Sequence, residues 1–157
     1  MEATIVNKSA FAAVGTLYHG KNDNQEIPQL WGEFGPRVGE VKGVINPDVC
    51  YGICDNFDES SGAFDYVAVL EVSDDATAPE GMVRWDIPAQ TYAVFECTLP
   101  TIGETFDHIH KTWFPQSGYQ RAPGPEFELY DKDFDPNNPS SKMQIFIPVL
   151  GGAKPRS

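Results

Sequence analysis

The residues with the clearest chemical potential are Glu128 and Tyr130, two positions apart in the apolar run 127–130. Such a run predicts a β-strand, whose alternate side chains point to opposite faces, so the carboxylate and the phenol share one face. A carboxylate among apolar groups either raises its pKa or receives a cation. The pair therefore indicates a cation site, or a general base, Glu128, with Tyr130 holding a water molecule or a leaving oxygen.

A matching segment in the first half of the chain predicts room for a ligand beside this pair. Residues 51–55 align with residues 127–131, which sets Gly52 and Cys54 at the positions of Glu128 and Tyr130. If the two strands flank one axis, the small pair leaves space opposite the large one. Aromatic residues are expected to line that space, and their faces favour a cation. The predicted ligand-binding set is Glu128, Tyr130, Trp31, Trp113, Tyr51, Gly52, Cys54 and Phe146.

The elements that must position these residues follow the same order twice. The first half predicts a strand over 3–18, or a strand pair broken near 7–9, and then a helix with apolar residues from Ile27 to Val38. Gly35-Pro36 should end or kink that helix, and strands follow at 50–54 and 66–72. The second half predicts a strand over 85–98, a helix from Ile102 to Trp113 that stops before Pro115, and strands at 127–130 and 143–150.

The two halves also match in residues, which predicts an internal duplication. Residues 12–14 align with 92–94, 30–31 with 112–113, and 57–58 with 134–135. We therefore expect an α+β fold of tandem strand-helix-strand-strand units, in which antiparallel sheets and two helices surround a pseudo-two-fold groove. Repeat 1 covers about 1–75 and repeat 2 about 80–150, in a single domain 1–150 with a flexible tail at 151–157.

The charge balance narrows the class of partner. The chain has 23 acidic and 11 basic residues and a formal net charge of −12, which repels phosphates and anionic membranes and attracts a small cation. The sequence has neither a signal-peptide pattern nor a long apolar span, so we expect a cytoplasmic protein with free thiols at Cys50, Cys54 and Cys97. We expect no cofactor and no metal, because His108 and His110 diverge on a helix and the loop 131–142 lacks the glycine and glutamate of a calcium loop.

Several segments in order resemble the GyrI-like family of effector-binding domains. They are residues 127–131, 134–136 and 145–149, preceded by 10–15, 27–31, 51–52 and 87–94. The resemblance covers nearly the whole chain. It implies a duplicated fold whose central groove binds bulky cationic aromatic compounds, with the family's glutamate at Glu128.

Three functions remain open from the sequence. The first is a stand-alone binding protein for lipophilic cations, expected because the resemblance begins with the first residues and leaves no segment for a DNA-binding module. The second, also implied by the resemblance, is a hydrolase of strained cyclopropane-bearing genotoxins that uses Glu128 and Tyr130 as its catalytic pair. The third is a protein-interaction module that inhibits a partner such as a topoisomerase through its acidic surface.

Overall fold

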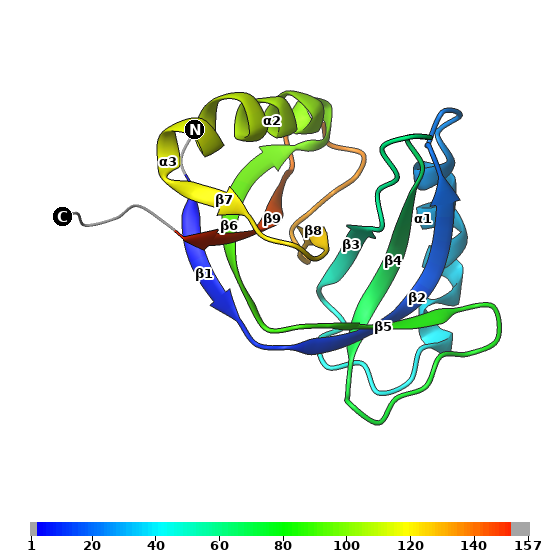
Figure 1. Cartoon of the computed structure of the whole chain (residues 1–157). Helices are drawn as coiled ribbons and strands as arrows, with labels where there is room; N and C mark the ends of the chain where they lie inside the picture. Colours follow the sequence, from blue (N-terminus) through cyan, green and yellow to red (C-terminus); the bar gives the residue numbers. More distant parts are fainter. Residues whose placement is uncertain (1–2, 152–157) are drawn as a thin grey trace.

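The computed structural model describes residues 3–151, which form an antiparallel sheet with helices on one face (Figure 1). The strands are β1 (Thr4–Lys8), β2 (Phe11–Gly20), β3 (Cys50–Asp55), β4 (Phe64–Val72), β5 (Val83–Ile87), β6 (Gln90–Thr98), β7 (Tyr119–Arg121), β8 (Glu126–Tyr130) and β9 (Lys142–Gly151). They lie in the order β1-β6-β9-β8-β3-β4-β2-β5, and β7 pairs with β9. The α-helices are α1 (Glu26–Phe34), α2 (Ile102–His108) and α3 (Phe114–Ser117). The predicted α+β fold is confirmed.

The duplication governs the topology. β2, α1, β3 and β4 form the first unit, and β6, α2 with α3, β8 and β9 form the second. The units join where β3 pairs antiparallel with β8, and at the centre of that pairing Gly52 lies opposite Glu128. The two units also exchange edge strands, because β1 pairs with β6 and β5 pairs with β2. The crossing of the two exchanged segments is visible below the sheet in Figure 1.

The exchange corrects the prediction of one continuous strand over 85–98. The chain leaves the strand conformation at Pro88-Ala89, so β5 ends at Ile87 and β6 begins at Gln90. Proline cannot donate a hydrogen bond to a ladder, which makes this a suitable place for the chain to change neighbours. The first unit breaks at the equivalent point, Ser9-Ala10, which confirms the alternative of a broken strand pair there.

The repeat alignment of residues 12–14 with residues 92–94 is wrong by one residue. Val14 and Ala93 both face the helices, whereas Tyr92 faces the opposite side of the sheet. Val14 therefore corresponds to Ala93. A strand has a side-chain period of two, so a shift of one residue turns every side chain to the wrong face.

The helix of the second unit also extends further than predicted. It does not stop before Pro115; a π-helical segment (Ile109–Trp113) follows α2, and α3 then continues to Ser117. Proline lacks an N–H and its ring collides with the carbonyl four residues earlier in a regular α-helix. The wider π turn immediately before Pro115 changes that local geometry, so the helix passes through the proline. In the first unit, α1 ends at Phe34 as predicted and a 3-10 turn (Gly35–Glu40) follows.

Three apolar clusters hold the sheet. Two lie on its helical face: α1 covers one through the buried Leu30 and Phe34, and the segment from α2 to α3 covers the other through Ile109 and Trp113. The third lies on the opposite face, where side chains from both units meet. Its buried members are Phe11, Ala13, Tyr51, Ile53, Val67, Val69, Ile87, Tyr92, Val94, Phe127 and Phe146.

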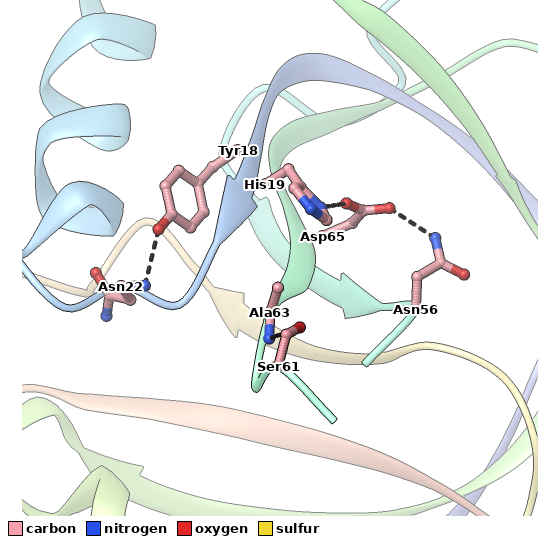
Figure 2. A network of polar contacts seen from close by, with 7 residues as sticks. All are labelled: Tyr18, His19, Asn22, Asn56, Ser61, Ala63 and Asp65. Atoms are coloured by element: carbon pink, nitrogen blue, oxygen red, sulfur yellow. Dashed lines mark hydrogen bonds and ion pairs between the residues drawn. The ribbon is translucent and has the colours of Figure 1, made fainter. Parts of the chain in front are cut away.

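A polar network at one end of the first unit fixes the approach to α1 (Figure 2). Tyr18 Oη accepts a hydrogen bond from the Asn22 backbone N–H at 2.8 Å, and Asn22 Oδ1 accepts one from Ile27 N–H at 3.0 Å in the first turn of the helix. Nearby, Asp65 pairs with His19 Nδ1 at 2.6 Å and accepts a bond from Asn56 at 2.8 Å. The Asn56 hydrogen bond, opposed in part by burial, and His19 lower the pKa of Asp65. These contacts tie the ends of β2, β3 and β4 together and anchor the start of α1.

Among residues 3–151, no helix is long and apolar enough to cross a membrane. The tail predicted at 151–157 begins with Gly151, which is the last residue of β9; the rest of it lies outside the described residues.

Candidate functional site

The site is organised around the carboxylate of Glu128 on β8. Its Oε1 accepts two hydrogen bonds, one from the Tyr130 hydroxyl at 2.7 Å and one from the Tyr66 hydroxyl at 2.8 Å. The Tyr66 oxygen in turn accepts a bond from Trp31 Nε1 at 2.9 Å. A chain of donors therefore runs from α1 through β4 to the carboxylate, and it fixes the position of that group.

The second oxygen of this carboxylate is the open one. Within residues 3–151, Glu128 Oε2 makes no hydrogen bond to the protein, and it is not among the fully buried polar atoms that lack a partner. Glu128 as a residue is only partly buried, so Oε2 is the carboxylate oxygen that remains for a bound molecule. A carboxylate with one oxygen held and one oxygen open can accept a hydrogen bond or a positive charge from a bound molecule.

Burial decides the electrostatics of the site. It raises the pKa of Glu128 above its ordinary value, and the nearby Glu126 adds to this, while the hydrogen bonds from Tyr130 and Tyr66 act in the opposite direction. Burial and the Glu128 charge also raise the pKa values of Tyr66 and Tyr130 well above that of an exposed tyrosine. Both phenols consequently remain protonated donors at neutral pH.

Two aromatic rings pack against Tyr130, the residue that donates to the carboxylate. The half-buried Trp31 ring meets the Tyr130 ring edge to face, with 5.6 Å between centroids, and the Phe134 ring lies 4.8 Å from that of Tyr130. Trp31 also packs edge to face on Phe34 of the same helix, at 6.2 Å. The structure thus brings together three residues of the predicted ligand-binding set, Trp31, Tyr130 and Glu128, and their role in binding stays a prediction.

Gly52 makes this arrangement sterically possible. It lies opposite Glu128 on one side and Ala68 on the other. A β-carbon at Gly52 would overlap the Tyr66 hydroxyl and lie 2.8 Å from Glu128 Oε1. The space predicted opposite Glu128 does exist, but the Tyr66 hydroxyl occupies it.

Tyr66 is the site residue that sequence reasoning missed. It was assigned to a strand without a role, although it faces the helical side and is only 2% exposed. The available signal was Gly52, because a glycine inside a strand often marks a place where another group approaches closely.

The cysteines differ in part from their predicted places. Cys54 was matched with Tyr130 by repeat, but across the β3–β8 pairing it lies opposite Glu126, and Cys50 lies opposite Tyr130. Cys54 does share the helical face with Glu128. All three cysteines of the chain are free thiols, and burial raises the pKa of Cys54 to about 12 and that of Cys50 to about 11.

Three predicted lining residues lie elsewhere. Tyr51 and Phe146 belong to the cluster on the opposite face, where both contact Phe127, because the period of two turns them away from Glu128. Trp113 is on the helical side, but its ring packs on Phe95 at 5.2 Å and stacks on Tyr119 at 5.7 Å. Trp113 therefore serves the core of the second unit.

Two hollows of the surface lie away from this site. One, of about 370 Å³, lies at the strand crossing and is lined by Asn7, Lys8, Ser9, Ala89, Gln90 and Thr91. The other, of about 200 Å³, is lined by Glu96, Leu129, Asp131, Asp133, Lys142, Met143 and Gln144. Neither lining includes the cluster of Glu128, Tyr66 and Tyr130, whose contacts and chemistry mark it as the candidate site.

The duplicated, edge-exchanged sheet and the family match define an effector-binding domain of the GyrI-like class. The chain belongs to the Cass2 family of integron-associated effector binding proteins, which it matches over residues 4–149. It is a small-molecule-binding domain.

Known proteins of two kinds are similar to it. It is 41% identical over 152 residues to the transcriptional regulator BrlR of Pseudomonas aeruginosa, a match that covers 95% of this chain and 56% of the regulator. The chain thus spans about half the length of that relative. Among solved structures it resembles SAV2435 bound to tetraphenylphosphonium, with a TM-score of 0.73, 17% identity and coverage of 96% of this chain and 95% of that one. It also resembles an integron cassette protein from Vibrio cholerae, with a TM-score of 0.56, 18% identity and coverage of 96% and 97%.

Proposed function

We propose that this domain binds bulky, lipophilic, cationic aromatic compounds with Glu128 as the acidic floor of the site. The observation that carries the proposal is that the two carboxylate oxygens of Glu128 have different surroundings. Oε1 is held by two tyrosine hydroxyls, and Oε2 has no hydrogen-bond partner within residues 3–151. A cation that reaches Oε2 meets a negative charge whose position is already fixed, so little ordering free energy is lost on binding.

The surroundings favour a cation with aromatic or apolar substituents. The faces of Trp31 and Tyr130 attract positive charge by about 0.5 to 2 kcal/mol each, depending on desolvation. Burial raises the pKa of Glu128, which means that the isolated carboxylate is under-solvated; a bound cation relieves that cost. The formal net charge of −12 adds a long-range attraction for cations.

Two comparisons support this choice of ligand. SAV2435, which has the same fold, was solved with tetraphenylphosphonium, a lipophilic aromatic cation. The chain's own family is one of effector-binding proteins, and its relative BrlR is a transcriptional regulator. We propose that the domain acts as the ligand sensor of such a system.

Titration calorimetry with tetraphenylphosphonium tests the proposal. We expect Glu128→Gln to weaken binding by about ten to one hundredfold, the effect of removing one partly desolvated charge. Glu96→Gln is the matched control: it removes the same charge from a side chain that is 59% exposed on β6, which β9 separates from β8, and the affinity should be unchanged.

A neutral ligand separates charge from shape. Tetraphenylsilane has the same four rings and carries neither a charge nor a hydrogen-bonding group, so it should bind wild type and Glu128→Gln with equal affinity. Equal affinity of both proteins for tetraphenylphosphonium would instead refute the role of Glu128.

Hydrolysis is a second candidate, favoured by one observation. Glu128 combines a raised pKa with a carboxylate oxygen that no group of residues 3–151 binds, and these are properties of a general base. The Tyr130 hydroxyl, 2.7 Å from Oε1, could orient the water or the leaving oxygen. Incubation with a cyclopropane-bearing alkylator, followed by mass spectrometry, tests this function; a rate equal to that of Glu128→Gln would exclude Glu128 as the base for that substrate.

A further inference from the structure

A second carboxylate lies on the same strand face as Glu128. Glu126 precedes it by two residues on β8, a spacing of about 7 Å along a strand. Across the strand pairing, Gly52 lies opposite Glu128 and Cys54 lies opposite Glu126. Both opposing residues are small, so no large side chain of β3 lies between the two carboxylates.

The two carboxylates have different partners. Glu128 is held by two neutral tyrosines. Glu126, whose side chain is 22% exposed, pairs with Arg121 at the end of β7, where a guanidinium nitrogen lies 3.2 Å from its Oε1. Glu128 therefore has no cationic partner within residues 3–151, whereas Arg121 offsets part of the charge of Glu126.

The position of Arg121 is fixed by more than this ion pair. Its guanidinium also donates to the carbonyl oxygens of Ala122 and Gly124, in the turn that leads into β8. These backbone contacts help to hold the positive charge beside Glu126 independently of the ion pair.

We infer that Arg121 sets the number of charges that the ligand can carry, and that Glu126 is a latent second cation subsite masked by Arg121. The inference rests on the proposed binding of a cation at Glu128. A ligand with a second cationic centre about 7 Å from the first would bring it close to Glu126 and Arg121 together. The attraction of that second centre to Glu126 and its repulsion by Arg121 then largely cancel. Nothing therefore offsets the free-energy cost of removing the second centre from water. The wild-type groove is therefore selective for monocations.

The test compares two phosphonium probes on a set of variants. Tetraphenylphosphonium has one cationic centre, and para-xylylene-bis(triphenylphosphonium) has two at a suitable spacing. The measured quantity is the ratio of dication affinity to monocation affinity, obtained by titration calorimetry at low salt. Arg121→Gln should raise this ratio about tenfold, the order expected when one partly exposed charge pair becomes available.

Three further variants identify the cause. Arg121→Lys retains the positive charge and should keep the ratio within about threefold of wild type. The double variant Arg121→Gln/Glu126→Gln should return the ratio to the wild-type value, because the unmasked carboxylate is gone. Arg84→Gln removes an arginine from a similar ion pair with Asp86 on the edge strand β5, and it should leave the ratio unchanged.

The possible failures are distinguishable. If wild type binds tetraphenylphosphonium in a Glu128-dependent manner, and folded Arg121→Gln leaves the ratio unchanged, only the role of Arg121 is refuted. A ratio that stays high in the double variant would also refute it, because Glu126 would not be the second subsite. If wild type does not bind tetraphenylphosphonium, the proposed function and this inference fall together. Thermal melting of each variant shows whether it is folded.

Discussion

Gly52→Ala is the smallest change that should disrupt the site. The added methyl group would overlap the Tyr66 hydroxyl, come within 2.6 Å of Tyr66 Cζ and lie 2.8 Å from Glu128 Oε1. Tyr66 is 2% exposed, so its ring has little room to move away. Relief of the overlap must therefore break the hydrogen bond from Tyr66 to Glu128 and disturb the bond from Trp31.

These contacts determine how far Gly52→Ala lowers the free energy of unfolding. Overpacking of a filled interior costs about 1 to 3 kcal/mol, and loss of a hydrogen bond to a charged group costs about 1.5 to 3 kcal/mol. The two costs are not additive, because a shift of the Tyr66 ring lowers the overpacking cost but breaks the hydrogen bond. Replacing glycine by alanine also restricts the unfolded chain and returns about 0.4 to 1 kcal/mol. We expect the free energy of unfolding to fall by about 2 to 3 kcal/mol.

A double-mutant cycle with Tyr66→Phe tests the cause. Without the hydroxyl, the largest overlap and the hydrogen bond are both absent, although the ring carbon still lies close, so Gly52→Ala should cost only about 1 kcal/mol. Urea unfolding of the four proteins at pH 7 therefore gives a coupling free energy of about 1 to 2 kcal/mol. Additive costs, with a coupling below about 0.5 kcal/mol, would show that the Tyr66 hydroxyl does not determine the requirement for glycine.

Four other predictions follow from the same geometry. The pKa of Glu128 is raised in the folded state, so the stability that its proton contributes is fully present below the ordinary glutamate pKa. This stability is lost as the pH rises through the folded-state pKa. Over that pH window, urea unfolding should show wild type losing stability relative to Glu128→Gln. Because the cation binds the ionised carboxylate, calorimetry should show tetraphenylphosphonium affinity rising with pH across the same window in wild type only. Phe146→Leu should lower the free energy of unfolding by about 1 to 2 kcal/mol in urea and leave cation affinity unchanged, because Phe146 is on the opposite face. Burial raises the pKa of Cys54 to about 12, so mass spectrometry should show its alkylation by iodoacetamide at pH 8 to be about a thousandfold slower than that of an exposed thiol.

The sequence predicted the unit order because that order depends on local patterns. Apolar spacing indicated the helix from Ile27 onward and its end at Gly35-Pro36, and both agree with α1. The errors arose where the answer depends on distant neighbours. Nothing local at Pro88-Ala89 reveals that the strand before it joins the first unit and the strand after it the second.

The candidate site was predictable to the extent that strand periodicity and the repeat determine it. The two-residue period placed Glu128 and Tyr130 on one face, and the alignment of residues 51–55 with 127–131 brought Gly52 opposite Glu128. Tyr51 and Phe146 were assigned to the site by their aromatic character, although the same period turns them to the other face. Tyr66 could not be assigned, because its role depends on the β3–β4 register, which joins segments separated by a loop.

The position of the site on the duplication axis has a physical reason. On such an axis, a residue of one unit faces the equivalent residue of the other, so Gly52 and Glu128 are both repeat partners and direct neighbours. Two glutamates there would repel each other at close range, and two glycines would provide no charge. The two units differ at this pair, which avoids both problems. Gly52 has no side chain, and the Tyr66 hydroxyl fills the free volume and donates a hydrogen bond to the carboxylate of Glu128. The Gly52–Glu128 pair is thus the point at which departure from the duplication creates an oriented charge.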